Sequence, residues 1–235
     1  MNVVTNEKLI KRNTRIAQIA GLAGMGVLIA GMVVLFRYPE QVMLTWLTVL
    51  GGFLLSQVGI YFTNRYGRRP RPDEQINSSL KGLDHNFTIY HYKTPTSHLL
   101  VGPAGIWVIV PRYQKGVITY EKGRYKQKTR NFMQGYMRIF GQEGLGRPEL
   151  EVESEKENIN RFLKKRLPDV ELPPVQAALV FTSEQAVLEN VDEAENPTIP
   201  VKKLKDVVRK AAKTKSMGMD KVKAINEVIG ENGKN

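Results

Sequence analysis

The chain has 235 residues, with 35 lysines and arginines against 23 aspartates and glutamates, which gives a formal net charge of +12 at pH 7. Hydrophobic residues make up 42% and charged residues 25%, which excludes a wholly disordered or collagen-like chain. There is no cysteine, so disulfides, thiolate zinc sites and cysteine nucleophiles are excluded too. The surplus of positive charge predicts an anionic partner, either nucleic acid or an acidic lipid surface.

Two uncharged apolar stretches lie near the N-terminus, at residues 16–36 and 42–62, and only the short segment 37–41 separates them. As a helix, each stretch would reach roughly 31 Å, which matches the hydrocarbon core of a bilayer. The alternatives are a cleaved signal peptide, whose apolar run is usually shorter, and a buried hairpin of a soluble protein. We predict two transmembrane helices in a hairpin that anchors the chain over residues 1–66, with the lipid bilayer as a partner.

Basic residues flank the outer ends of this predicted hairpin, whereas the connecting segment carries only Arg37. The flanking residues are Lys8, Lys11, Arg12 and Arg15 before the first stretch, and Arg65, Arg68, Arg69 and Arg71 after the second. Lysine and arginine near the ends of membrane spans are retained on the cytoplasmic side. We therefore predict a multi-pass protein of the bacterial inner membrane with both termini in the cytoplasm.

Small residues recur four positions apart in both stretches. The pairs are Ala20/Gly24, Gly26/Ala30 and Gly52/Ser56. Small side chains at this spacing let two membrane helices approach closely, although glycine is also common in membrane helices in general. We take the spacing as support for packing within the hairpin.

A basic linker at residues 67–72 separates the hairpin from a predicted cytoplasmic domain at 73–212, and a C-terminal tail at 213–235 has few apolar residues to anchor it. Hydrophobic periodicity and turn residues predict the elements of the domain. Helices are expected at 73–83, 147–167 and 201–215, and strands at 85–92, 98–101, 106–110, 116–121, 124–127, 175–181 and 199–201. Segment 175–181 is nearly all apolar, which predicts a strand covered on both faces. The predicted fold class is α/β, with a mixed β-sheet flanked by helices after the transmembrane hairpin.

The predicted helix at 147–167 combines an apolar stripe with an acidic first half. The stripe consists of Leu150, Ile159, Phe162, Leu163 and Leu167, and the acidic residues are Glu149, Glu151, Glu153, Glu155 and Glu157. Acidic residues at the start of a helix and basic residues at its end complement the helix dipole. We interpret the acidic run as a solvated face in preference to a metal site.

The string LLVGPAGIWVIVPRYQKG at residues 99–116 resembles the hallmark of the nuclease-related domain, NERD, a branch of the PD-(D/E)xK nuclease superfamily. Further likenesses are Glu74 in the early helix, Arg147 and Pro148 at a helix start, and the strand end at 179–182. The resemblance covers residues 73–212 and implies a restriction-endonuclease-like fold. Members of this superfamily cleave phosphodiesters with a divalent metal held by an aspartate and by the glutamate of an E-x-K motif.

The positions that resemble the family's four catalytic residues are Glu74, Ser97, Val110 and Arg112, and only Glu74 matches. Valine cannot bind a metal, serine is a poor substitute for a carboxylate, and arginine cannot serve as a base. The chain is therefore expected to be a catalytically inactive scaffold without a cofactor. The alternative is a Mg²⁺-dependent nuclease with a rearranged site, for which Asp84 or Glu121 would supply the missing carboxylate.

A basic segment with interleaved tyrosines follows the predicted hallmark strand. Its cations are Arg112, Lys115, Lys122, Arg124, Lys126, Lys128 and Arg130, and Tyr113, Tyr120 and Tyr125 lie between them. This composition is typical of a surface that tracks phosphates and stacks bases. A solvated hairpin beside an anionic membrane explains it equally well, so nucleic acid and anionic lipid both remain candidate partners.

The three histidines are His85, His91 and His98. Their spacing fits no standard zinc pattern, so we expect histidines on strand surfaces and no metal site.

Overall fold

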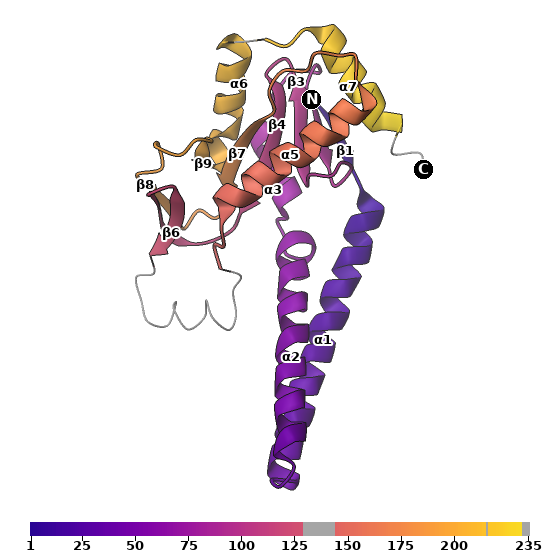
Figure 1. Cartoon of the computed structure of the whole chain (residues 1–235), viewed down its shortest axis with the longest axis vertical. Helices are drawn as coiled ribbons and strands as arrows, with labels where there is room; N and C mark the ends of the chain where they lie inside the picture. Colours follow the sequence, from indigo (N-terminus) through magenta and orange to yellow (C-terminus); the bar gives the residue numbers. More distant parts are fainter. Residues whose placement is uncertain (129–143, 215, 232–235) are drawn as a thin grey trace. The chain divides into compact units, whose positions relative to one another are not determined.

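A computed structural model describes residues 1–128, 144–214 and 216–231 of the chain. The described residues fall into two compact units. The helical unit is Glu7–Arg71, and the α/β unit is formed by Met1–Asn6 together with the described residues from Pro72 onward (Figure 1).

The helical unit consists of α1 (Glu7–Arg37), α2 (Val42–Phe62) and the π-helical turn η1 (Thr63–Gly67). The bounds predicted for the second apolar stretch are those of α2, whereas α1 starts well before residue 16 because its charged N-terminal turns are helical too. Both helices are long and apolar enough to cross a membrane, and only 17% and 11% of their most apolar windows are buried. Core helices of soluble proteins are mostly buried, whereas α1 and α2 are mostly exposed.

Glycines bring α1 and α2 into close contact. A Cβ on Gly24 would lie 2.6 Å from Ser56 Oγ, and a Cβ on Gly52 would lie 2.7 Å from a side-chain carbon of Leu28, so larger side chains cannot fit. The expected pairs Ala20/Gly24 and Gly52/Ser56 therefore pack between the helices. The expectation for Gly26 and Ala30 was wrong, because both residues are exposed on α1 and a Cβ on Gly26 would meet nothing within 4 Å.

The α/β unit contains a mixed six-stranded sheet in the order β1-β2-β3-β4-β7-β9. These strands are β1 (Asn2–Thr5), β2 (Thr88–His91), β3 (His98–Gly102), β4 (Gly105–Arg112), β7 (Gln176–Phe181) and β9 (Thr198–Pro200). β2, β3 and β4 are antiparallel, and the other neighbours pair in parallel. A second, three-stranded sheet has the order β6-β5-β8, with β5 (Gly116–Glu121), β6 (Arg124–Lys128) and β8 (Ala186–Glu189).

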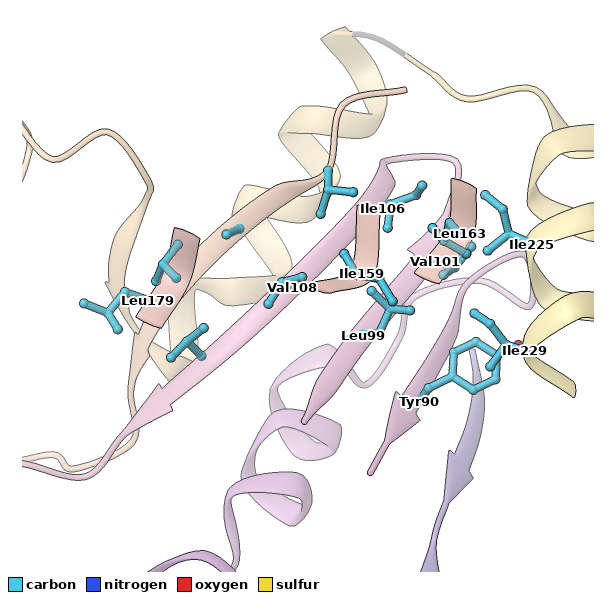
Figure 2. Packing of buried hydrophobic residues seen from close by; sticks show 14 of the residues in the cluster. Tyr90, Leu99, Val101, Ile106, Val108, Ile159, Leu163, Leu179, Ile225 and Ile229 are labelled. Carbon is cyan, nitrogen blue, oxygen red and sulfur yellow. The ribbon is translucent and has the colours of Figure 1, made fainter. Parts of the chain in front are cut away.

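Helices cover both faces of the large sheet (Figure 1). α5 (Pro148–Arg166) and α7 (Met219–Glu231) pack on one face, whereas α3 (Pro72–Leu80) and α6 (Leu204–Thr214), which follows the short turn η2 (Val201–Lys203), pack on the other. Figure 2 shows the first of these cores, where Ile159 of α5 and Ile225 of α7 lie against the strands. β7 alternates between the two cores, with Leu179 in the first and Val180 in the second, as predicted for a strand covered on both faces.

Two expectations about the helices need correction. Leu150 is 52% exposed, and Val152 is buried instead in the apolar stripe of α5. The segment expected to be a weakly anchored tail forms α7, whose Ile225 and Ile229 lie in the core with almost no exposure. The domain therefore continues to at least the end of α7.

The N-terminus of the chain forms an edge strand of the large sheet, which the sequence analysis missed. β1 pairs in parallel with β2. The backbone amides of Asn2 and Asn6 donate hydrogen bonds to the carbonyl oxygens of Phe87 and His91 at 2.8 and 3.0 Å, respectively. The Met1 ammonium group donates to the Leu83 carbonyl oxygen at 3.1 Å. The segment that precedes α1 is thus built into the same sheet as strands that follow α2.

Candidate functional site

The family-like position Arg112 lies at the end of β4, beyond the stretch of β4 that pairs with β3. The Arg112 carbonyl oxygen accepts a hydrogen bond from the backbone amide of Thr182, after β7, at 2.7 Å. Backbone groups alternate along a strand, so those of the preceding Pro111 point to the opposite side, where pairing with β3 has already ended. Proline has no amide hydrogen to donate there. The proline therefore leaves no ladder hydrogen bond unmade. A proline is tolerated at such a local edge of a sheet.

The Arg112 side chain makes a two-pronged ion pair with Glu151 of α5. Both guanidinium NH₂ groups donate to the carboxylate, one of them at 3.2 Å. The Arg112 side chain is 9% exposed and that of Glu151 is 37% exposed. A planar guanidinium matches a carboxylate in this geometry, so the positive charge of Arg112 is neutralised within the fold. Arg112 is consequently removed from the set of cations expected to face a partner.

Val110 is the residue that the sequence resemblance aligns with the metal-binding carboxylate of an E-x-K motif. It is 3% exposed and belongs to the core beneath α5, together with Leu179 and Phe181. The site is therefore filled by hydrocarbon, and the residue two positions further on is the paired Arg112. No metal ligand can be provided by either side chain.

The structure does not bring all four family-like positions together. Val110 and Arg112 point to the face covered by α5, whereas Glu74 belongs to α3, whose Ile76 and Leu80 pack on the opposite face. Ser97 precedes β3 and is half-buried, and its carbonyl oxygen accepts the Tyr92 amide at 2.8 Å.

The two carboxylates suggested for a rearranged site have other partners. Asp84 Oδ1 accepts the Asn86 amide at 2.9 Å in a local turn. Glu121 accepts a hydrogen bond from Lys126 Nζ at 2.8 Å and lies 3.8 Å from Lys128 Nζ. The hydrogen bond and charge of Lys126 hold the pKa of Glu121 below its usual value. Among the residues that the structure describes, no group of three or more His, Cys, Asp or Glu side chains could hold a metal ion.

The basic segment predicted from the sequence forms the hairpin of β5 and β6. Arg124, Lys126 and Lys128 alternate along β6 as exposed residues, roughly 7 Å apart. Lys126 and Lys128 share Glu121, which offsets part of their charge. Lys115 and Lys122 are also exposed, and Arg130 lies outside the described residues.

Two of the interleaved tyrosines do not share the face of these cations. Tyr125 alternates with the exposed residues of β6 and packs against the core, and its hydroxyl lies 2.5 Å from Thr198 Oγ1. Burial raises the pKa of Tyr125. Tyr120 is its cross-strand partner, with the ring centroids 4.8 Å apart. Neither ring joins the lysines in a stacking platform, so the combination expected for single-stranded nucleic acid is not formed by these two residues.

Two of the three histidines form a buried pair, although all three were expected on strand surfaces. His91 and His98 face each other across β2 and β3 with exposures of 0% and 1%, and their Nδ1 atoms are 2.8 Å apart. His91 Nε2 lies 2.9 Å from Asn77 Oδ1 of α3. One Nδ1 must donate and the other accept, so the pair shares one hydrogen. His85 is exposed.

Comparisons with protein-family models, with curated proteins and with solved structures gave no match to this chain.

Proposed function

We propose that the chain is a membrane-anchored, non-catalytic binding module built on a NERD-like, restriction-endonuclease-like α/β scaffold. The observation that carries the proposal is the ion pair of Arg112 with Glu151, beside Val110 in the core. Where a nuclease of this superfamily needs a carboxylate and a free cation beside the scissile phosphate, this chain has hydrocarbon and a neutralised guanidinium. The described residues thus favour binding over metal-dependent cleavage.

The anchor is the hairpin of α1 and α2, with both termini in the cytoplasm. Length, apolarity and low burial of the two helices support it, and so does the close glycine packing between them. The position of β1 gives independent support for an even number of crossings. β1 immediately precedes α1 and pairs with β2, which follows α2, so the chain has to leave and re-enter one side of the membrane. The flanking cations then orient that side toward the bacterial cytoplasm.

The partner of the module is anionic. The exposed cations of the β5–β6 hairpin support this proposal, namely Lys115, Lys122, Arg124, Lys126 and Lys128. Exposed lysines and arginines attract the phosphates of nucleic acid and those of acidic lipid headgroups alike. The inward position of Tyr125 favours an electrostatic contact without base stacking.

The absence of cysteine makes the topology directly testable. A single cysteine replaces Glu40, between α1 and α2, or Lys210 of α6, and intact cells are treated with a membrane-impermeant maleimide. We expect labelling of E40C from outside and labelling of K210C only after lysis. Labelling of K210C in intact cells, or extraction of the chain by alkaline carbonate, would contradict the proposed anchor.

The absence of catalysis is tested with the purified full chain in a neutral detergent. We expect no cleavage of single- or double-stranded DNA or RNA with Mg²⁺ or Mn²⁺. Metal-dependent cleavage that disappears in Glu74→Ala would support the alternative nuclease instead.

A further inference from the structure

A second basic surface of the described α/β unit lies on η2 and α6, away from the β5–β6 hairpin. We call it the α6 basic face. It consists of Lys202, Lys203, Lys205, Arg209, Lys210 and Lys213, and the one acidic residue among them is Asp206. The opposite side of α6 is apolar, and its Leu204 and Val208 are fully buried against the sheet. Packing on the sheet therefore fixes which side of the helix faces outward.

Three cations of this face contact other parts of the fold. Lys205 Nζ and an Arg209 NH₂ group donate to the carbonyl oxygens of Lys81 and Gly82, just after α3, at 3.1 and 3.0 Å. These contacts satisfy carbonyls near the end of α3. Lys202 Nζ lies 2.6 Å from Glu184 Oε1, and this pair lowers the pKa of Glu184.

The other three cations of the face, Lys203, Lys210 and Lys213, are exposed. They make no hydrogen bond or ion pair through their side chains with any residue that the structure describes. In the β5–β6 hairpin, Lys126 and Lys128 share Glu121, and three exposed cations, Lys115, Lys122 and Arg124, likewise have no such partner among the described residues. The two surfaces therefore carry similar uncompensated charge, and the chemistry of their side chains has to separate them.

The side chains of this face indicate what kind of anion it binds. No aromatic residue lies between Lys202 and Lys213, so bases have nothing to stack on. Five of its six cations are lysines, which act as point charges, whereas bidentate readout of phosphates in nucleic acids favours arginine. The apolar side of α6 is used by the core, so the helix cannot insert into a bilayer. Peripheral contact with a layer of anionic headgroups fits these properties.

The proposed anchor also ties the α/β unit to such a layer through short connections. Only residues 68–71 separate η1 from α3, and a chain of that length spans at most about 14 Å. On the other side, Asn6 of the α/β unit is bonded directly to Glu7 of α1. We infer that the α6 basic face docks on anionic phospholipid headgroups of the membrane that holds the hairpin. This inference rests on the proposed function, because it takes the hairpin to be in the bilayer.

The test uses the full chain with one cysteine at Thr214, the exposed last residue of α6, labelled with an uncharged fluorescent donor. The labelled chain is reconstituted into vesicles of phosphatidylcholine alone or with added phosphatidylglycerol, each containing an acceptor lipid. We expect energy transfer to rise with phosphatidylglycerol and to return to the phosphatidylcholine level at about 1 M salt, where the Debye length is about 3 Å.

Charge reversal then assigns the docking surface. In K203E/K210E/K213E, the ratio of docked to free α/β unit should fall by about 100-fold or more, because each lysine near an anionic surface contributes about a fivefold factor. K115E/K122E/R124E tests the competing surface on the hairpin. The matched control is K164E/K165E/K223E, which also reverses three exposed lysines but lies on α5 and α7. We expect this control to change the ratio less than about threefold.

Several results would overturn the inference. Energy transfer that is equal in the two kinds of vesicle excludes headgroup docking, and a larger effect of the hairpin reversal moves the site away from α6. Binding of a single-stranded oligonucleotide that K203E/K210E/K213E abolishes, without any dependence on phosphatidylglycerol, identifies nucleic acid as the partner. If the chain is released from phosphatidylcholine vesicles by salt or carbonate, the anchor itself fails, which is distinguishable from a failure of docking.

Discussion

The ion pair between Arg112 and Glu151 makes an asymmetric prediction about stability. Glu151→Gln leaves the charge of Arg112, whose side chain is 9% exposed, without a counter-charge. Stranding a fully buried charge costs about 3–5 kcal/mol, but the Glu151 side is 37% exposed and water reaches it, so we expect about 2 kcal/mol. Arg112→Met leaves behind a carboxylate that water can solvate, and we expect about 1 kcal/mol or less. The double variant Arg112→Met/Glu151→Gln should be at least as stable as the single variant Arg112→Met.

Unfolding of the α/β unit can be followed by one tryptophan. The chain has two, Trp46 in α2 and the buried Trp107 in β4, so a Trp46→Phe background reports on Trp107 alone. Urea or thermal unfolding of the full chain in a neutral detergent gives the free energy, and 2 kcal/mol corresponds to a drop in Tm of about 4–8 °C.

Glu157→Gln is the matched control for Glu151→Gln. Glu157 lies on the same helix and is 3.9 Å from Arg161, but both side chains are more than 70% exposed. We expect a change below about 0.5 kcal/mol. If Glu151→Gln proves as mild as Glu157→Gln, the guanidinium of Arg112 is not held by the pair, and the argument that this position is closed to phosphate fails.

Three further predictions concern other parts of the fold. Gly24→Leu should lower the temperature at which the chain loses its helical circular dichroism in detergent, because a Cβ on Gly24 already meets Ser56 Oγ at 2.6 Å. Gly26→Leu should leave this temperature unchanged, because a Cβ on Gly26 meets nothing within 4 Å. Ile225→Ala, which truncates a fully buried side chain of α7, should destabilise the α/β unit by about 2–4 kcal/mol in urea unfolding, and a negligible effect would contradict the core position of α7. Burial raises the pKa of Tyr90 from its ordinary value of 10.0 to about 12, so the unfolded chain ionises first and stability should fall as the pH rises from 10 toward 12. Tyr90→Phe should flatten this part of the pH profile of the urea midpoint, and an unchanged slope would contradict burial as its cause.

Long patterned segments could be predicted from the sequence. The predicted bounds of α2 are those observed, and β5, β6 and β7 differ from their predictions by at most one residue at an end. These segments have either an uninterrupted apolar run or a clear turn beside them, so local periodicity is sufficient. β1 and β8 have four residues each, which is too short for a period to be recognised. α7 was missed because its apolar residues are few, and their burial depends on the sheet beneath them.

The contacts that define the candidate site depend on tertiary structure. Glu151 was assigned to a solvated acidic face, and only the packing of α5 across the end of β4 shows that it meets Arg112. His91 and His98 were expected on strand surfaces, but the register of β2 against β3 places them opposite each other under α3. The separation of Tyr125 from the lysines of β6 follows from the strand alternation. Strand pairing and face assignment therefore decide these roles, and neither can be derived from spacing alone.

The most direct test of the non-catalytic assignment is a cleavage assay on the purified full chain with Mn²⁺ and with Mg²⁺. Wild type, Glu74→Ala and Glu151→Gln are compared on single- and double-stranded DNA and RNA with a long incubation. We expect all three preparations to leave the substrates intact to the same extent as buffer with metal. Metal-dependent cleavage by the wild type that is lost in Glu74→Ala would contradict the non-catalytic assignment.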